Sequence, residues 1–413
     1  MATASSSTRS RRDVLASVAG SIVCSAPVFL VGSAAVQIRA SLHFSTSRLG
    51  FAVALFYLGA GASAIPLGRV AEAIGGLRMM RIAALGSGIM LLLVALVARS
   101  WLSLALVMVP AGVASAAMQP AVNLFLTRRI AKERQGLAFG LKQSSVPLAA
   151  MLGGLAVPSV ALTLGWRWSF VIASVAAVLT ALLLPRPRQS LAAHRSARQA
   201  AGSVPFDRLP VTVFAVGFGL GVAAAGALNA FIVSSAVAGG VAHATAGYLA
   251  AFGGAVAAAS RILNGRLADR RTRDHLRPVA TLLAIGGLGY GALALISAHH
   301  LLDGYFPVIA VVFAAGWGWN GLLTYTVVRT YPDHPARATG ITQAGGRLGG
   351  MVGPLAFGLI VDHASYALAW LLAGGAALLA AGTIATGHRL MKRRTAAPAA
   401  APVSSHAAPL PGV

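Results

Sequence analysis

Long apolar stretches dominate the chain, and short polar gaps separate them. Each stretch is long enough for one helix to cross about 30 Å of hydrocarbon. None alternates with the two-residue period of a barrel strand. The pattern predicts an all-α membrane protein with twelve transmembrane helices, at 14–38, 46–67, 79–98, 102–126, 136–163, 168–184, 210–237, 245–265, 278–297, 305–328, 339–361 and 366–386.

Composition supports this class. The chain is 57% hydrophobic and 10% charged, and its mean hydropathy is +0.76. The net charge of +24 is also typical of nucleic-acid-binding proteins. Here the basic residues occupy short gaps and no sizeable soluble domain is apparent, so we expect no nucleic-acid partner. With Cys24 as the one cysteine, an intrachain disulfide and a cysteine-based metal cluster are excluded. We expect no cofactor and no metal.

The distribution of basic residues predicts the orientation in the membrane. Arg39, Arg48, Arg99 and Arg167 fall on one side, and three more lie within apolar stretches, which leaves 26 of the 33 Lys and Arg for the other side. Basic loops stay in the cytosol, so both termini should be cytoplasmic, in a bacterial inner membrane. The segment SRRDVLAS at 10–17 resembles a twin-arginine signal. The many apolar stretches that follow favour an uncleaved first span instead.

The chain divides into two halves that repeat one another. We expect a cytoplasmic N-terminus at 1–13, a six-helix bundle at 14–184, a cytoplasmic linker at 185–209, a second bundle at 210–387 and a disordered tail at 388–413. Segment 138–156 aligns with 338–356 at an offset of 200 residues. Gly68-Arg69-x-Ala71-Glu72 likewise matches Gly265-Arg266-x-Ala268-Asp269. Parallel repeats of this kind are a transporter architecture.

The twelve spans, the central loop and these two motifs resemble the major facilitator superfamily. That resemblance implies two pseudo-symmetric six-helix bundles and a gating motif after spans two and eight. It depends on Gly68, Arg69, Glu72, Gly75 and Arg78 in the first copy, and on Gly265, Arg266, Asp269 and Arg270 in the second. The first copy departs from the family with Glu72 and Ala73, and the second lacks the later glycine.

The resemblance implies that these loops latch the cytoplasmic side closed when the transporter opens outward. We expect Gly265 to end its helix, where a side chain would clash, and Asp269 to pair with arginines or a helix N-terminus. The alternative is a solvated turn whose basic residues only keep the loop in the cytosol.

Ionisable residues inside the spans narrow the chemical class of the expected substrate. None of the nine acidic residues lies at mid-span, so the carboxylate relay common in proton-coupled transporters is missing. Lys142, Arg261 and Arg347 do lie inside spans, either lining a cavity or snorkelling to the cytoplasm. An acid-free basic cavity suits anions. The candidate substrate-binding residues are Arg347, Gln343, Lys142, Gln143, Asn320, Trp317, Asn229 and Arg261.

We therefore interpret the chain as a secondary active transporter of a small organic solute, with organic anions preferred, working by alternating access. Its partners would be the solute, with or without a coupling proton or ion, and membrane lipid, and we expect a monomer. Drug or metabolite efflux by proton antiport is the alternative, although the span-five export pattern survives only as Pro147 and Gly153–Gly154. An enzyme is disfavoured, because no catalytic motif is present and GWGWNG at 316–321 lacks the preceding strand of a dinucleotide site.

Overall fold

The computed structural model describes residues 2–130, 132–185, 208–270, 276–331 and 334–396, and these residues form helices without strands. Within these described residues, twelve helices are long and apolar enough to span a membrane, which confirms the predicted number. The first six spans contain α1 (Ala2–Ser33), α3 (Thr46–Ile74), α4 (Gly76–Val97), α5 (Trp101–Arg129), α6 (Lys132–Ala156) and α7 (Trp166–Leu183). The last six contain α8 (Arg208–Ala238), α9 (His243–Arg270), α10 (Leu276–His299), α11 with α12 (Tyr305–Val311 and Asn320–Thr330), α13 (Pro335–His363) and α14 (Tyr366–Ala396).

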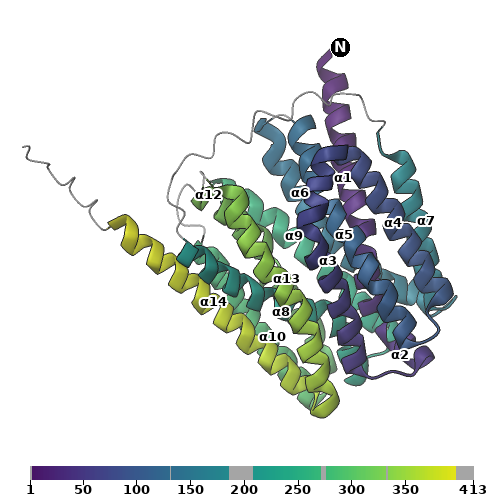
Figure 1. The fold of residues 1–413 in the computed structure, drawn as a ribbon. Coiled ribbons are helices and arrows are strands. Elements are labelled where there is room, and N and C mark those ends of the chain that lie inside the picture. The colour runs from purple at the N-terminus through teal and green to yellow at the C-terminus, as the bar shows by residue number, and fades with distance from the viewer. Residues whose placement is uncertain (1, 131, 186–207, 271–275, 332–333, 397–413) are drawn as a thin grey trace, which may run out of the picture.

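The helices form two bundles of six spans each, the fold that the repeat predicts. Helices α1 and α3 to α7 lie to the right in Figure 1, and α8, α10, α13 and α14 lean away from them to the left. We call the end of the molecule that holds Arg12, Arg78, Arg129, Arg208 and Arg266 the basic end, and the other the opposite end. The N-terminus and α2 (Ala35–Leu42) mark these two ends in Figure 1.

Several helix boundaries differ from the predictions. Helix α9 continues through Gly265 to Arg270, so the expectation that Gly265 ends its helix was wrong. A side chain at Gly265 would meet no atom within 4 Å, and a glycine at an exposed helix position does not force a stop. The helix end lies instead at Gly75, whose positive φ of 89° favours glycine. Helix α14 continues to Ala396, past residue 387 where the second bundle was expected to end.

Three of the described spans contain irregular segments. The stretch expected as one helix at 14–38 divides at Ala34 into α1 and α2. Span ten passes from α11 into a π-helical turn at Val312–Gly316 and resumes only at Asn320. A second π-helical turn, Val157–Ala161, ends span five. Such turns are frequent at functional sites, and the one in span ten places the backbone of Trp317 next to α9.

Two glycine-rich seams join the bundles in the half of the molecule near the opposite end. In the first seam α3 runs against α13: a Cβ on Gly50 would overlap the carbonyl oxygen of Pro354, and one on Gly358 would lie 2.7 Å from that of Thr46. In the second seam α6 runs against α9: a Cβ on Gly154 would overlap the backbone of Ala251, and one on Gly254 would lie 2.5 Å from the nitrogen of Met151. Small residues let membrane helices approach to backbone contact.

The same four helices separate toward the basic end. Glycines there have no heavy atom within 4 Å of the position that a Cβ would take: Gly68, Gly140, Gly265 and Gly340. The bundles are therefore closed against one another at the opposite end and apart at the basic end.

A polar contact adds to the first seam. The carboxylate of Asp362, at the end of α13, accepts hydrogen bonds from the backbone nitrogens of Thr46 and Ser47 at 3.0 and 2.7 Å. These nitrogens belong to the first turn of α3, whose amide groups have no partner within the helix. The positive end of the α3 dipole also favours a carboxylate there. Asp362 of the second bundle thus caps a helix of the first.

Candidate functional site

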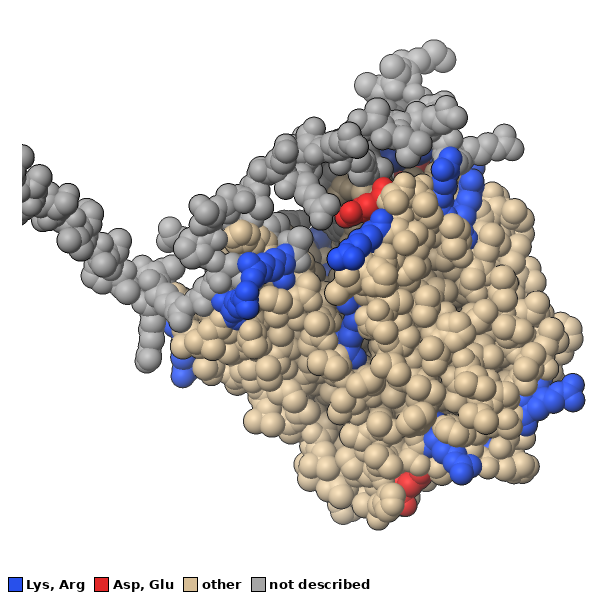
Figure 2. Space-filling model, viewed as in Figure 1, with Lys and Arg blue, Asp and Glu red and all other residues tan. Residues whose placement is uncertain are grey.

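Three basic side chains lie inside the spans at similar depth. Arg347 is 12 residues after the start of α13, Lys142 is 10 after the start of α6, and Arg261 is 9 before the end of α9. At 1.5 Å per residue these positions lie about 14–18 Å from the helix ends at the basic end. Figure 2 shows a furrow between the two bundles with basic side chains within it. The seams end at this level, so the cations lie where the bundles separate.

Arg347 lies at the end of the α3–α13 seam. A Cβ on Gly61 of α3 would lie 3.7 Å from Cδ of Arg347, so the alkyl part of the arginine passes over that glycine. The residue is half-buried. Its guanidinium has no hydrogen bond, ion pair or aromatic contact with any residue in the described part of the chain. Arg347 therefore carries a partly desolvated charge with its donors unused.

Arg261 lies at the end of the α6–α9 seam and is held by neutral groups. Nη1 donates to the backbone carbonyl of Gln143 at 2.8 Å, and Nη2 donates to that of Trp317 at 3.4 Å. The guanidinium also lies 5.0 Å from the centre of the Trp317 ring. The side chain is 8% exposed, so it does not snorkel. Because Gln143 and Arg261 belong to different bundles, this arginine joins them.

Lys142 is the third cation, and it too is buried rather than snorkelling. Its side chain is 5% exposed, and Nζ donates to the side-chain oxygen of Gln119 on α5. The partner is neutral, so the charge of Lys142 is solvated without being cancelled. Gln119 was not among the predicted site residues. Its place next to Pro120 in an otherwise apolar span is the sequence signal that could have identified it.

Two of the other predicted residues, Trp317 and Asn229, are held by contacts within the protein. Trp317 is buried, and its ring packs 5.9 Å from both Phe29 of α1 and Phe313, so it bridges the bundles as a packing residue. Asn229 donates from Nδ2 to the Ala225 carbonyl of its own helix at 2.7 Å. The side chains of the last three predicted residues, Gln143, Gln343 and Asn320, are half-buried, and Gln343 lies one helical turn before Arg347.

The gating motif lies at the basic end in an open arrangement. Arg69, Glu72 and Arg78 of the first copy are exposed, as is Arg266 of the second. Among described residues, none of these four has a hydrogen bond or ion pair that would hold the basic end closed. The side chains of Asp269 and Arg270 lie outside the described residues.

Comparison with known proteins assigns the chain to a family. Residues 18–334 match the Major Facilitator Superfamily. The chain belongs to this superfamily. Its twelve described helices that are long and apolar enough to cross a membrane are those of a multi-pass membrane protein of this superfamily.

Individual relatives are distant. An uncharacterized MFS-type transporter of Mycobacterium tuberculosis, found in two strains, is 26% identical over 260 residues, which are 59% of this chain. The chain matches 55% of the length of these relatives. Crystal structures of a bacterial homolog of the human lysosomal transporter Spinster share the fold. The inward-facing unoccupied form has a TM-score of 0.75 at 17% identity, covering 93% of this chain and 98% of that one. The occupied form has a TM-score of 0.70 at 18% identity, covering 91% and 96%.

The geometry around Arg261 generates a prediction. Arg261→Lys keeps the charge but loses the planar fork that reaches two carbonyls and the face of a tryptophan. We expect a lower melting temperature of the purified protein, because the carbonyls of Gln143 and Trp317 lose a donor each. Arg266→Lys is the matched control: this arginine is exposed on the same helix and should tolerate the change. Equal melting temperatures for the two variants would contradict the bridging role.

Proposed function

We propose that the chain is a secondary active transporter for small organic anions and that Arg347 binds the anionic group. The observation that carries this proposal is the guanidinium of Arg347, half-buried at the level where the bundles separate and without a partner among the described residues. A charge at membrane depth costs at least about 2.5–3.5 kcal/mol on insertion scales. A substrate carboxylate would offset that cost, and the planar fork of arginine suits a carboxylate.

The surroundings of Arg347 support the same sign of charge. Lys142 and Arg261 have neutral partners, so neither positive charge is cancelled. No acidic residue in the described part of the chain pairs with any of the three cations. Uncancelled positive charges at a similar depth raise the local concentration of anions. A cationic drug would meet repulsion from the same groups, which argues against drug efflux as the main function.

Alternating access would operate through the two seams. The present conformation is closed at the opposite end and open at the basic end. The basic end should face the cytosol of a bacterial inner membrane, since basic loops remain inside, and this conformation would then admit solute from the cytosol. In the outward-open state the exposed Arg69, Glu72 and Arg78 would approach the second copy of the motif and form the latch. A proton or another ion could provide the coupling.

Substitution of Arg347 tests the proposal. Arg347→Gln should reduce the transport of carboxylates in proteoliposomes at least about tenfold, because removing one partner of a buried charge-assisted contact costs about 1.5–3 kcal/mol. Arg347→Lys should be intermediate, since a lysine presents no planar fork. The measurement is the initial rate of radiolabelled uptake across a panel of mono- and dicarboxylates, with and without an imposed pH gradient.

The control for this assay is Arg208→Gln, which removes one exposed charge at the basic end, outside the gating motif. The proposal requires slower transport by Arg347→Gln than by this control at equal amounts of folded protein. Two results would remove Arg347 from the binding site. One is an unchanged rate and apparent affinity in Arg347→Lys for every carboxylate. The other is transport of cationic drugs that persists in Arg347→Gln.

The orientation has its own test. In a chain carrying Cys24→Ser, a cysteine at Ser365 should react with an impermeant maleimide added to intact cells. A cysteine at Ala73 should react only after the membrane is permeabilised. Both native residues are exposed, at the opposite end and the basic end respectively. The reverse pattern would invert the topology and reassign the open end to the outside.

A further inference from the structure

A pocket of about 530 Å³ lies at the opposite end, far along the spans from the three buried cations. Residues of both bundles form it: α2, the loop that follows it and the start of α3 from the first, and α8 and α14 from the second. The lining residues are Val36, Arg39, Ala40, His43, Phe44, Thr46, Ser234, Val237, Ala238 and Tyr366. None of these ten is acidic.

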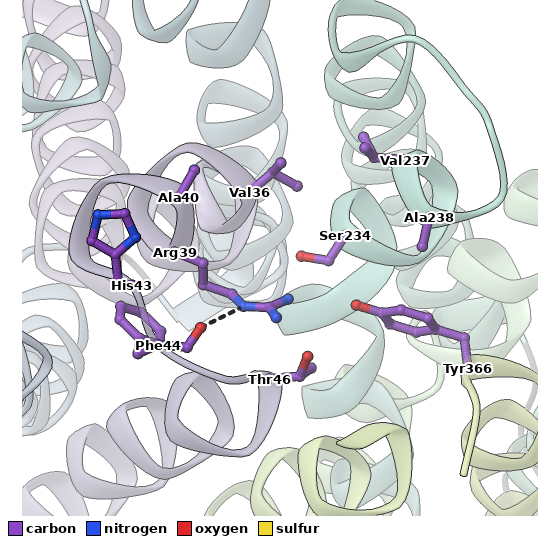
Figure 3. A pocket seen from close by; sticks show the side chains of 10 residues that line it. All are labelled: Val36, Arg39, Ala40, His43, Phe44, Thr46, Ser234, Val237, Ala238 and Tyr366. Carbon is purple, nitrogen blue, oxygen red and sulfur yellow. Dashed lines mark hydrogen bonds between the residues drawn. The ribbon is translucent and has the colours of Figure 1, made fainter. Parts of the chain in front are cut away.

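The polar groups of the pocket converge on one point. Figure 3 shows the guanidinium of Arg39 reaching from α2 toward the hydroxyl of Tyr366, with the hydroxyls of Ser234 and Thr46 beside it. Arg39 is fixed through Nε, which donates to the carbonyl of Phe44 at 3.2 Å. Its terminal nitrogens remain directed into the pocket.

Ser234 supplies an independent indication that the pocket binds a ligand. Its side chain is 3% exposed, and its buried hydroxyl forms no hydrogen bond of ordinary geometry with a described residue. The hydroxyl points toward the guanidinium of Arg39 (Figure 3). A buried hydroxyl that lacks a good hydrogen bond is costly, and a ligand oxygen that accepts a hydrogen bond from it would remove that cost.

We propose that this pocket, which we call the outer site, binds a small carboxylate at the opposite end of the transporter. The carboxylate oxygens would accept two hydrogen bonds from the terminal nitrogens of Arg39, in the bidentate geometry that arginine offers. The hydroxyls of Ser234 and Tyr366 donate to the remaining lone pairs. Apolar contacts from Val36 and Val237 suit a short alkyl group on the same ligand.

Binding at the outer site favours the present conformation. Arg39 and Thr46 belong to the first bundle, and Ser234 and Tyr366 belong to the second, so the four groups surround one ligand only while the opposite end is closed. A ligand that binds one state shifts the equilibrium toward that state by its difference in affinity. External carboxylate therefore holds the transporter open at the basic end. This conclusion stands whether or not the transported solute is an anion.

The test measures the melting temperature of the purified full chain in neutral detergent while sodium acetate replaces the sodium salt of a bulky sulfonate buffer at constant ionic strength. We expect the melting temperature of the wild type to rise by about 2–4 °C at ten times the dissociation constant. Arg39→Gln should remove the part of the rise that the outer site supplies. Arg48→Gln should retain the rise. This substitution removes the same charge from the same end, but Arg48 lies over Trp101, outside the pocket.

Two further variants keep the test decisive if Arg39→Gln fails to fold. Ser234→Ala and Tyr366→Phe each remove one hydroxyl, and each should raise the apparent dissociation constant of acetate about 2- to 10-fold. Arg347→Gln removes the carboxylate site of the proposed function, so the acetate-dependent rise that remains in this variant comes from the outer site, and adding Arg39→Gln to it should abolish that rise. A rise lost in Arg347→Gln but kept in Arg39→Gln, or no rise in the wild type, would overturn the outer site. Neither result would bear on which end of the molecule faces the cytosol.

Discussion

Backbone-to-backbone contact between the two bundles is the constraint on which the rest of the structure depends. Along the α3–α13 seam, Gly50 lies against Pro354, and Gly358 lies against Thr46. Gly154 and Gly254 do the same for α6 and α9. In lipid, helices gain no hydrophobic free energy by associating, so the close packing of small residues must drive their association. The seams hold the two bundles together at the opposite end, while the bundles lie apart at the basic end.

The buried charges become intelligible from the position of these seams. Arg347 and Arg261 lie where the seams end, and both would be far more costly within the packed half of the molecule. Arg261 is held by carbonyls from both bundles, so it extends its seam by a polar contact. Arg347 has no such partner among the described residues. Asp362 strengthens the first seam from its other end by capping α3.

The sequence predicted the elements whose signal is local. Twelve apolar stretches of sufficient length, the repeat of 138–156 in 338–356 and the bias of basic residues together predict two six-span bundles. The same reasoning misplaced the helix end at Gly265, because a glycine's effect on a helix depends on its surroundings, and no atom of another described residue lies within 4 Å of the Cβ position here. The break at 317–319 in span ten was not foreseen either, since its residues remain apolar throughout.

The candidate site was only partly accessible to such reasoning. Lys142, Arg261 and Arg347 are conspicuous because ionisable residues are rare in spans, but their partners are not. Gln119 lies 23 residues from Lys142, and the Gln143 carbonyl is 118 residues from Arg261. The group around Arg39 combines residues from four helices or their ends, and only tertiary structure brings it together. Such partners cannot be predicted from the sequence, because polar contacts across a bundle interface leave no periodic pattern along the chain.

Paired distances at the two ends test the central claim, that glycine contacts hold the opposite end closed while the basic end opens. Spin labels at Leu164 and Leu301 would report on the opposite end, and labels at Ala73 and Leu267 on the basic end, in a chain carrying Cys24→Ser; all four positions are exposed. Gly50→Val should lengthen the first distance and shorten the second, as measured by pulsed electron–electron double resonance. Gly375→Val is the control, since its Cβ would meet no atom within 4 Å. Distances that stay unchanged in Gly50→Val, or that both lengthen, would contradict alternating access through these seams.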